Sequence, residues 1–409
     1  MDTSLPTHFD FDNIVDRTHS GSIKWDWYPA DVLPMWVADM DFKTPDGILR
    51  AMSERIAHGV FGYEMPSKQL RQVIVDWCAR QYDWVIQPQD IVFLPGLVNG
   101  LNVMSRIYGQ IGDSALMLTP VYHPFLTAPT NNGMQADKVT LTRIDAGNGN
   151  GNGSDTNNTF DYDIDFDALE KAITPRTRMF IHCHPHNPAG KEFTKEQNMR
   201  LSELCLKHGL LMVSDEIHCD LMLGGTKHTP VAALSPEIGN NTITLMAPSK
   251  TFNIPGLKSS FAIVQNPRLR KQLENQDHAL IASISNLGLA ATQAAYSDCD
   301  DWLAELLGYL TTNRDTMLDF VAENLPDVRA IVPNATYLGW LDCTHAGIKE
   351  TESPYQFFLR EAKVALTDGT IFGPGGEGFV RLNFGCPRAQ MMQALERMAD
   401  ALHTLRKTT

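Results

Sequence analysis

The chain has 409 residues, which is more than one hydrophobic core usually supports, so we expect two domains. Its formal net charge is −14 and no dense block of Lys and Arg occurs, which argues against DNA or RNA and favours a small-molecule substrate. No apolar run approaches the ~20 residues that span a bilayer, and the first residues lack the basic start and apolar centre of a secretory signal. We therefore expect a cytoplasmic protein without membrane contact.

Cysteine usage gives no sign of a disulfide framework. The seven cysteines are odd in number, scattered along the chain and never spaced as C-x-x-C. This pattern is typical of reduced, buried thiols rather than of a disulfide scaffold or a zinc site. The sequence predicts no metal ion.

From residue 46 to residue 290, short apolar runs alternate with segments of helical length. Five of the runs are almost entirely apolar, which is typical of strands buried on both faces, and they cover residues 115–118, 179–183, 210–213, 243–247 and 261–264. One intervening helix is marked by Thr194 as its N-cap, Gln197 as the partner in a capping box and Gly209 at its end. The pattern predicts a large α/β domain over residues 46–290 with a mostly parallel sheet.

Two further segments complete the expected organisation. Residues 147–158 are rich in Gly and Asn and cannot bury apolar surface, so they are expected to form a flexible insertion. After residue 290 the pattern changes to longer helices at 291–324 and 387–407, with a short β segment at 337–341 between them. We expect residues 291–409 to form a smaller α+β domain, against which residues 1–45 pack.

The residues that follow the expected strands are chemically active types. Tyr122, Asn187, Asp215 with His218, and Lys250 each come shortly after one of four successive strands. In open α/β sheets, ligands bind beyond the carboxyl ends of the strands, so these side chains are expected at one crevice. Taken singly, each has an ordinary explanation, such as a helix cap for Asp215, a turn residue for Asn187 and a core side chain for Tyr122.

Lys250 is the most informative of these residues. A lysine between two apolar strands is partly desolvated, which lowers the pKa of its amine and favours the neutral nucleophile that forms imines. At Gly96, a strand–turn–helix junction offers free backbone N–H groups to a phosphate. No dinucleotide or Walker motif is present there, so a single phosphate and a plain turn are the two alternatives.

In order and spacing, these segments resemble the pyridoxal-phosphate (PLP) enzymes of the aspartate-aminotransferase fold type, the class I and II aminotransferase superfamily, over nearly the whole chain. The motifs are the N-P-x-G turn at Asn187, S-D-E-I-H at 214–218, S-K-T-F-N-x-x-G-L at 249–257 and the late Arg381. The resemblance implies the PLP-dependent transferase fold type I, with a large α/β domain and a smaller α+β domain. It also implies PLP as cofactor and a homodimer with shared active sites.

The resemblance also implies a role for each matching residue. Lys250 binds the cofactor as an imine and acts as catalytic base, with Tyr63 and Tyr122 as further catalytic residues. On the cofactor ring, the resemblance places Asp215 at the pyridine nitrogen, Asn187 and His218 at the phenolic oxygen, and Tyr122 against the ring face. The phosphate is bound by Gly96, Leu97, Val98, Ser249 and Lys258. Tyr63 of the neighbouring subunit completes the cofactor-binding set. Arg381 binds the substrate carboxylate, and Ala38, Trp36 and Tyr337 complete the substrate pocket. Lys258 stands where the family usually has an arginine, and Ala247 where it commonly has a serine.

Four segments are similar to the cystathionine β-lyase / C–S lyase branch rather than to ordinary transaminases, namely residues 34–42, 61–66, 215–220 and 336–343. Within them, His218 stands where transaminases commonly carry a tyrosine. The implied reaction is α,β-elimination from L-cystathionine or another cysteine S-conjugate, giving a thiol such as homocysteine, pyruvate and ammonia. An aminotransferase and a PLP-fold regulatory protein with incidental lyase activity are the alternatives.

Overall fold

The computed structural model describes residues 9–145, 159–275 and 282–408, so the expected insertion at 147–158 lies outside the described residues. Its larger sheet has seven strands, with β10 antiparallel to both neighbours and the strands from β9 to β4 parallel. Their order across the sheet is β2 (Ile91–Leu94), β10 (Ser260–Ile263), β9 (Thr242–Met246), β8 (Leu211–Asp215), β7 (Thr177–Cys183), β3 (Ser114–Thr119) and β4 (Gln135–Thr140). All five predicted strands and the mostly parallel sheet are confirmed.

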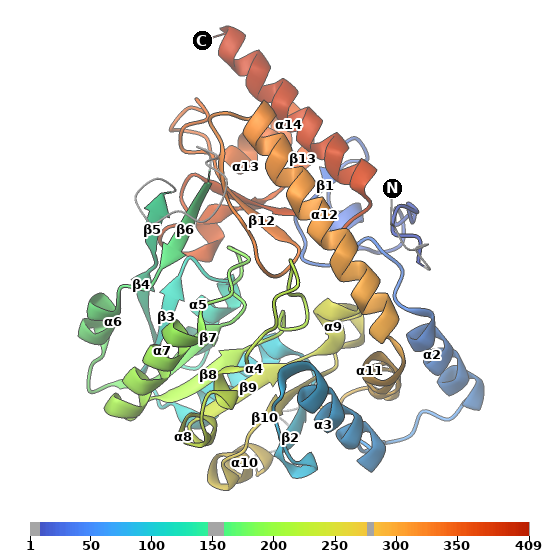
Figure 1. The fold of residues 1–409 in the computed structure, drawn as a ribbon, viewed down its shortest axis with the longest axis vertical. Helices are drawn as coiled ribbons and strands as arrows, with labels where there is room; N and C mark the ends of the chain where they lie inside the picture. Colours follow the sequence, from blue (N-terminus) through green and yellow to red (C-terminus); the bar gives the residue numbers. More distant parts are fainter. Residues whose placement is uncertain (1–8, 146–158, 276–281, 409) are drawn as a thin grey trace.

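Helices cover both faces of this sheet (Figure 1). Successive strand side chains point to opposite faces, so Met117 packs with the apolar cluster under α4 (Leu97–Tyr108) and α5 (His123–Asn131). Its neighbour Leu116 packs with the cluster under α6 (Phe166–Ala172) and α7 (Lys195–His208). Burial on both faces explains why these strands are continuous apolar runs.

The predicted helix after Thr194 is confirmed as α7, together with its capping box. The Gln197 backbone N–H donates to Thr194 Oγ1 at 3.1 Å, and the Thr194 N–H donates to Gln197 Oε1 at 2.9 Å. Gly209 ends the helix with a positive φ of 65°, a backbone conformation that glycine adopts without steric cost.

A third group of helices packs beside the sheet around the largest apolar cluster. The structure divides the helix expected at 291–324 into α11 (Asn286–Asp298) and α12 (Asp300–Asn324), so the expectation of one continuous helix is wrong. Asp300 and Asp301 lie in the first turn of α12, where negative side chains stabilise a helix start. The helices α2 (Asp46–His58), α3 (Lys68–Tyr82) and α9 (Pro248–Thr251) adjoin the same cluster. Two further helices, α8 (Pro236–Asn240) and α10 (Pro267–Glu274), pack on the clusters at the faces of the larger sheet.

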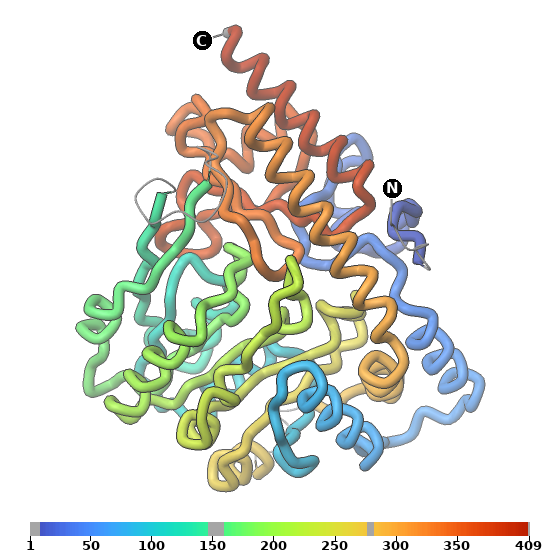
Figure 2. Tube along the Cα trace, in the orientation of Figure 1, coloured from blue at the N-terminus to red at the C-terminus, as the bar shows by residue number. Residues whose placement is uncertain are grey.

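A smaller, six-stranded sheet lies in the upper half of Figure 1. Its order is β14 (Thr367–Asp368), β15 (Phe379–Asn383), β12 (Leu338–Asp342), β11 (Arg329–Ile331), β6 (Thr159–Asp163) and β5 (Thr142–Asp145). Strand β6 therefore pairs with the C-terminal strand β11, and β5 pairs with β6 at the edge, although both come from the middle of the chain. The helix α14 (Arg388–Thr408) lies alongside α12 above this sheet, as Figure 2 also shows.

The N-terminal segment joins this upper half. It holds the short helix α1 (Ile23–Asp26), and β1 (Leu33–Pro34) pairs in parallel with β13 (Val364–Ala365), close to α13 (Pro354–Phe357). Phe11 packs edge-on against Trp302 of α12, with ring centroids 5.6 Å apart. Among the described residues, no helix combines the length and the apolar character that crossing a membrane requires.

We expect Thr194→Ala to lower the free energy of unfolding by about 1 kcal/mol, because the first turn of α7 loses its side-chain cap. The urea midpoint measured by circular dichroism checks this. Thr312→Ala is the matched control, since Thr312 is an exposed threonine inside α12 that caps no helix end. Equal loss of stability in both variants would contradict the capping role.

Candidate active site

A cavity of about 380 Å³ lies at the carboxyl ends of the parallel strands. The structure brings eleven predicted site residues together in its wall: Ala38, Gly96, Leu97, Val98, Tyr122, Asn187, Asp215, His218, Ser249, Lys250 and Lys258. Arg381 and Tyr337 adjoin this wall through hydrogen bonds to Asn187 and to the Ala38 carbonyl. The placement follows from the parallel topology, because strands with the same direction end at the same edge.

Lys250 lies in α9, directly after β9. Its Nζ donates a hydrogen bond of 2.5 Å to the carbonyl oxygen of Ala38. Burial lowers the pKa of Lys250 to about 8. The positive charges of Arg381 and Lys258 also lower this pKa, whereas the carboxylates of Asp39 and Asp215 raise it. About one tenth of the amine is therefore neutral at pH 7, against roughly one part in two thousand for a lysine with the usual pKa of about 10.4, and imine formation requires the neutral form.

Asp215 is the last residue of β8 and faces the same cavity. Burial raises the pKa of Asp215 to about 7, and the neighbouring Glu216 carboxylate adds to the effect. The backbone N–H of Ile217 donates to Asp215 Oδ1 at 3.1 Å and fixes the carboxyl group. A protonated ring nitrogen placed here would stabilise the carboxylate form, since an opposite charge lowers the pKa of a buried acid.

Arg381, on β15, reaches the cavity from the smaller sheet. Its NH1 donates to Asn187 Oδ1 at 2.9 Å and its NH2 donates to the Trp36 carbonyl at 2.9 Å. The Nε atom is buried without a partner among the described residues, so one donor is free for a ligand. Because Asn187 Oδ1 accepts from Arg381, the Asn187 amide hydrogens are left for a cofactor oxygen.

His218 stands between the cavity and Tyr337. Its Nδ1 is buried without a partner in the described chain, and its ring lies 6.1 Å from the Tyr337 ring, edge to face. Burial, with Lys250 and Arg381 nearby, holds the pKa of His218 well below its usual value, so the imidazole is neutral. The Tyr337 hydroxyl donates to the Ala38 carbonyl at 2.9 Å, the same oxygen that accepts from Lys250.

The opposite end of the cavity is formed by the start of α4. Gly96 precedes the helix with φ 132°, and no side chain caps the first turn. The Gly96 N–H donates to Ser260 Oγ at 2.9 Å, which leaves the amides of Leu97 and Val98 for an anion. Lys258 and Ser249 line this part of the wall and add a positive charge and a hydroxyl.

Two predicted site residues are placed differently from the rest. Trp36 contributes its backbone carbonyl to Arg381, while its ring packs against Trp27 and Tyr28 at centroid distances of 6.2 and 5.6 Å. Tyr63 does not line the cavity and is fully exposed in the single chain.

Sequence reasoning missed three polar groups at the site. Thr367 Oγ1 accepts from Arg381 NH2 at 3.2 Å, Ser260 accepts from Gly96, and Asn99 lies in the cavity wall with a buried, unpartnered Oδ1. Ser260 follows Lys258 so closely that a search for phosphate-binding hydroxyls would find it. Thr367 had no such indication, because its contact with Arg381 comes from pairing of β14 and β15.

The residues of the cavity fit PLP. A desolvated amine, a buried carboxyl group and an uncapped helix start match the aldehyde, the pyridine nitrogen and the phosphate of that cofactor. The unpartnered polar atoms of His218 and Arg381 are further donors directed at a bound group. The fold and this site define a PLP-dependent enzyme of the aspartate-aminotransferase fold type.

Comparisons with known proteins agree with this class. Residues 30–398 match the family of class I and II aminotransferases. The chain is 38% identical over 399 residues to cystathionine beta-lyase PatB of Bacillus subtilis, covering 96% of this chain and 99% of that protein. The PLP-containing crystal structure of cystalysin from Treponema denticola superposes with a TM-score of 0.90 at 30% identity, over 98% of this chain and 100% of that one.

The PLP-bound C–S lyase of Staphylococcus hominis is similar as well, with a TM-score of 0.87 at 32% identity over 96% of this chain and 99% of that one. The chain therefore belongs to the class I and II aminotransferase family, in its C–S lyase branch. Its cofactor is PLP, as the resemblance implied.

We expect the rate at which the cofactor-free protein takes up PLP to rise with pH, with a midpoint near 8. Only the neutral amine attacks the aldehyde. Because the pKa of Lys250 is lowered to about 8, the neutral fraction of this amine increases as the pH rises through that value. Stopped-flow absorbance measures the rate. N-acetyl-lysine methylamide with PLP is the control, with an expected midpoint near the usual amine pKa of about 10.4. A protein midpoint as high as this control would contradict the desolvated Lys250.

Proposed function

We propose that the chain cleaves the Cβ–S bond of L-cystathionine or a related cysteine S-conjugate by α,β-elimination. The products are a thiol such as homocysteine, pyruvate and ammonia. The observation that carries the proposal is the intact Lys250 cavity in a chain that is similar over its full length to a cystathionine beta-lyase. A cytoplasmic location fits the buried, unpaired state of all seven cysteines.

When bound, PLP supplies an electron sink for the electron pair left at Cα. Asp215 supports this by holding a proton on the pyridine nitrogen, from a position at the end of β8 that the Ile217 N–H fixes. Asn187 would hold the phenolic oxygen through the amide hydrogens that Arg381 leaves free, and Tyr122, which lines the cavity, would pack against the ring. The helix start at Leu97 and Val98, with Ser249 and Lys258, binds the phosphate.

Lys250 moves the proton. Once the substrate amine has displaced it, the neutral Lys250 amine takes the proton from Cα, and the resulting ammonium gives a proton to the sulfur as the Cβ–S bond breaks. The Ala38 carbonyl accepts from Lys250 Nζ and from the Tyr337 hydroxyl, which keeps the freed amine beside the reacting carbon. Water then hydrolyses the released enamine to pyruvate and ammonia.

Arg381 binds the α-carboxylate of the substrate. It is buried among Phe372, Asn187 and the Trp36 carbonyl, and its unpartnered Nε–H is one of the donors that face the ligand. A charge-assisted bond in such a dry site is stronger than one in water. Ala38, Trp36 and Tyr337 define the rest of the substrate pocket in this proposal.

Purified protein with L-cystathionine should release pyruvate and free thiol in equal amounts, and Lys250→Ala should lose this activity together with the absorbance of the lysine-bound cofactor. Pyruvate is measured with lactate dehydrogenase and the thiol with a chromogenic disulfide. If the PLP-loaded protein forms neither product, the proposal is wrong. An aminotransferase would instead form stoichiometric glutamate from 2-oxoglutarate without ammonia.

Arg381→Lys should raise KM for the amino acid by about 10- to 100-fold, because charge-assisted hydrogen bonds worth about 1.5–3 kcal/mol are lost. Steady-state kinetics checks this. Arg388→Lys is the control, since the Arg388 guanidinium stacks on Tyr309 and bonds to Asn313 away from the cavity. An equal rise of KM in both variants would contradict the carboxylate role of Arg381.

We further propose a homodimer in which Tyr63 completes the active site of the neighbouring subunit. Ile56, Val60, Phe61, Tyr63 and Met65 are all exposed within one short segment, which is an unusual density of large apolar side chains on a surface. A partner subunit that covers this segment would remove those side chains from water. It would also bring the Tyr63 hydroxyl to the active-site cavity of the partner subunit, because Tyr63 does not line the cavity of its own chain.

Mixing inactive Lys250→Ala with low-activity Tyr63→Ala subunits tests this arrangement. In a mixed dimer one site has both native residues, so random reassortment at equal amounts should restore about one quarter of the wild-type activity. The activity is measured before and after subunit exchange in mild denaturant. No gain over the unmixed Tyr63→Ala protein would contradict a Tyr63 shared between subunits.

A further inference from the structure

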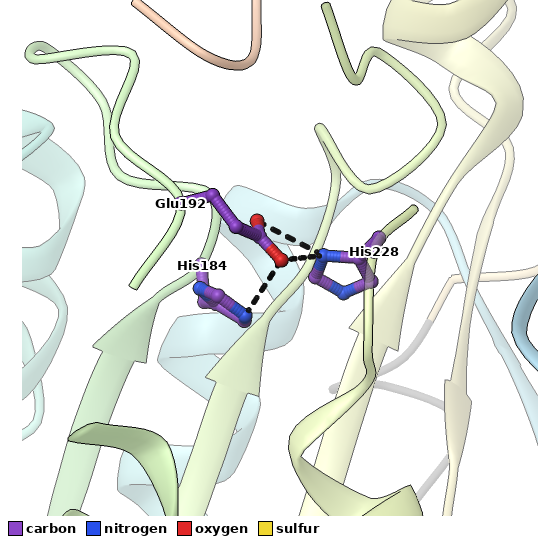
Figure 3. Close-up of side chains that lie close together, drawn as sticks. All are labelled: His184, Glu192 and His228. Atoms are coloured by element: carbon purple, nitrogen blue, oxygen red, sulfur yellow. Dashed lines mark hydrogen bonds and ion pairs between the residues drawn. The ribbon is translucent and has the colours of Figure 1, made fainter. Parts of the chain in front are cut away.

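His184, Glu192 and His228 form a largely buried cluster, and Figure 3 shows the three side chains pointing toward one another. His184 follows β7, Glu192 precedes α7, and His228 lies in the loop between β8 and α8. Both histidine side chains are completely buried, and the Glu192 side chain is 15% exposed. We propose that these three residues bind one divalent transition-metal ion, with Zn²⁺ as the ion that suits the donors best.

The donor atoms are spaced as zinc ligands are. Tetrahedral Zn²⁺ with bonds of about 2.0–2.2 Å separates its ligand atoms by about 3.3 Å. Glu192 Oε1 lies 3.4 Å from His184 Nε2 and 3.0 Å from His228 Nδ1. All three donor atoms lie within 4.8 Å of one another. Two imidazoles and one carboxylate are a common zinc set that leaves the fourth position to water.

The hydrogen bonds around His228 prepare it for a metal. Its Nε2 lies 2.8 Å from Glu216 Oε2, and Glu216 Oε1 accepts from the Ser214 hydroxyl at 2.7 Å and from the Val231 N–H at 3.1 Å. With Nε2 donating to Glu216, the Nδ1 lone pair points at Glu192, where the ion would lie. A carboxylate behind a ligating histidine is the usual support of zinc sites.

His184 has a competing partner that the ion would displace. The Asn198 amide nitrogen lies 3.1 Å from His184 Nε2, the nitrogen that faces Glu192. Asn198 keeps two other contacts, with His182 Nε2 at 3.0 Å and with the Phe193 carbonyl at 3.2 Å. The exchange therefore costs one neutral hydrogen bond and frees one of the two Asn198 amide hydrogens, while the other hydrogen and Oδ1 keep their partners.

The charges of the cluster also fit a divalent cation. The Glu216 carboxylate is completely buried and the Glu192 carboxylate is mostly buried, and burying such charges is costly unless they are neutralised. One divalent ion with two neutral imidazoles balances both. The alternative is a metal-free cluster in which a protonated His228 donates to both Glu192 and Glu216, and the experiment below separates the two.

A surface cleft of about 520 Å³ adjoins one side of the cluster. It is lined by His228 and the adjoining residues 224–227, and it shares no lining residue with the cofactor cavity. Neither His184 nor Glu192 lines this cleft, so it reaches the cluster only on the side of His228. Bound there, the ion would tie the turn that carries Asn187 to the loop that follows Asp215, so its role is structural support of the cofactor pocket.

The test uses untagged PLP-loaded protein that has been treated with a chelator and then exposed to Zn²⁺ or Co²⁺. We expect about one equivalent of Zn²⁺ per chain by mass spectrometry of the metal, and the visible absorbance of tetrahedral Co²⁺. Glu192→Gln and His184→Gln should abolish both, while Glu216→Gln should weaken Zn²⁺ binding by about 10- to 100-fold. His186→Gln is the control, because this buried histidine of the same turn bonds to the carbonyls of Pro120 and Cys183 instead.

Failure of the wild-type protein to bind either ion would overturn the proposal and leave the protonated cluster. Binding that survives both Glu192→Gln and His184→Gln would overturn it as well, since the ion would then lie elsewhere. If these variants do not fold, the wild-type Co²⁺ spectrum decides: a tetrahedral spectrum supports the site, and an octahedral one or none refutes it. The melting temperature gives an independent readout. Zn²⁺ should raise it in the wild type and in the His186→Gln control, and should not raise it in Glu192→Gln or His184→Gln.

Discussion

The partial burial of Lys250, which lowers the pKa of its amine, is the constraint on which the rest of the site depends. Its hydrogen-bond partner is the carbonyl of Ala38, and the carboxylates of Asp39 and Asp215 act on it only through space. A carboxylate bonded directly to the amine would favour the protonated form and remove its reactivity. Burial beside a carbonyl instead lowers the pKa of Lys250 to about 8, so that one side chain can serve as nucleophile and as base.

The carbonyls that hold this site come from the segment between β1 and α2. Ala38 accepts from Lys250 of the larger sheet, and Trp36 accepts from Arg381 of the smaller one. Asn383 fixes the segment by donating to the carbonyls of Val37 and Asp39, both at 2.6 Å. The cavity is therefore complete only when this N-terminal segment docks against both sheets, and its contribution is made by the backbone rather than by side chains.

Most of the larger sheet and its chemistry could be predicted because the information is local. Strands buried on both faces are apolar runs, and in a parallel sheet the residues after those runs meet at one edge, which placed Asp215, Asn187 and Lys250 together. The break at Cys299 was missed because the apolar pattern continues across it. Thr367 at Arg381 was missed because only the pairing of distant strands creates that contact.

The end of β8 explains how one short segment can serve two sites. Successive residues of an extended chain point to opposite sides, so Asp215 faces the cofactor cavity while Glu216 faces His228. The Asp215 carbonyl in turn accepts from the His184 N–H at 3.0 Å, which ties the turn that carries Asn187 to the same strand end. A change in the packing around Glu216 therefore reaches both Asp215 and the turn of Asn187 through the backbone, which couples the cluster to the wall of the cavity.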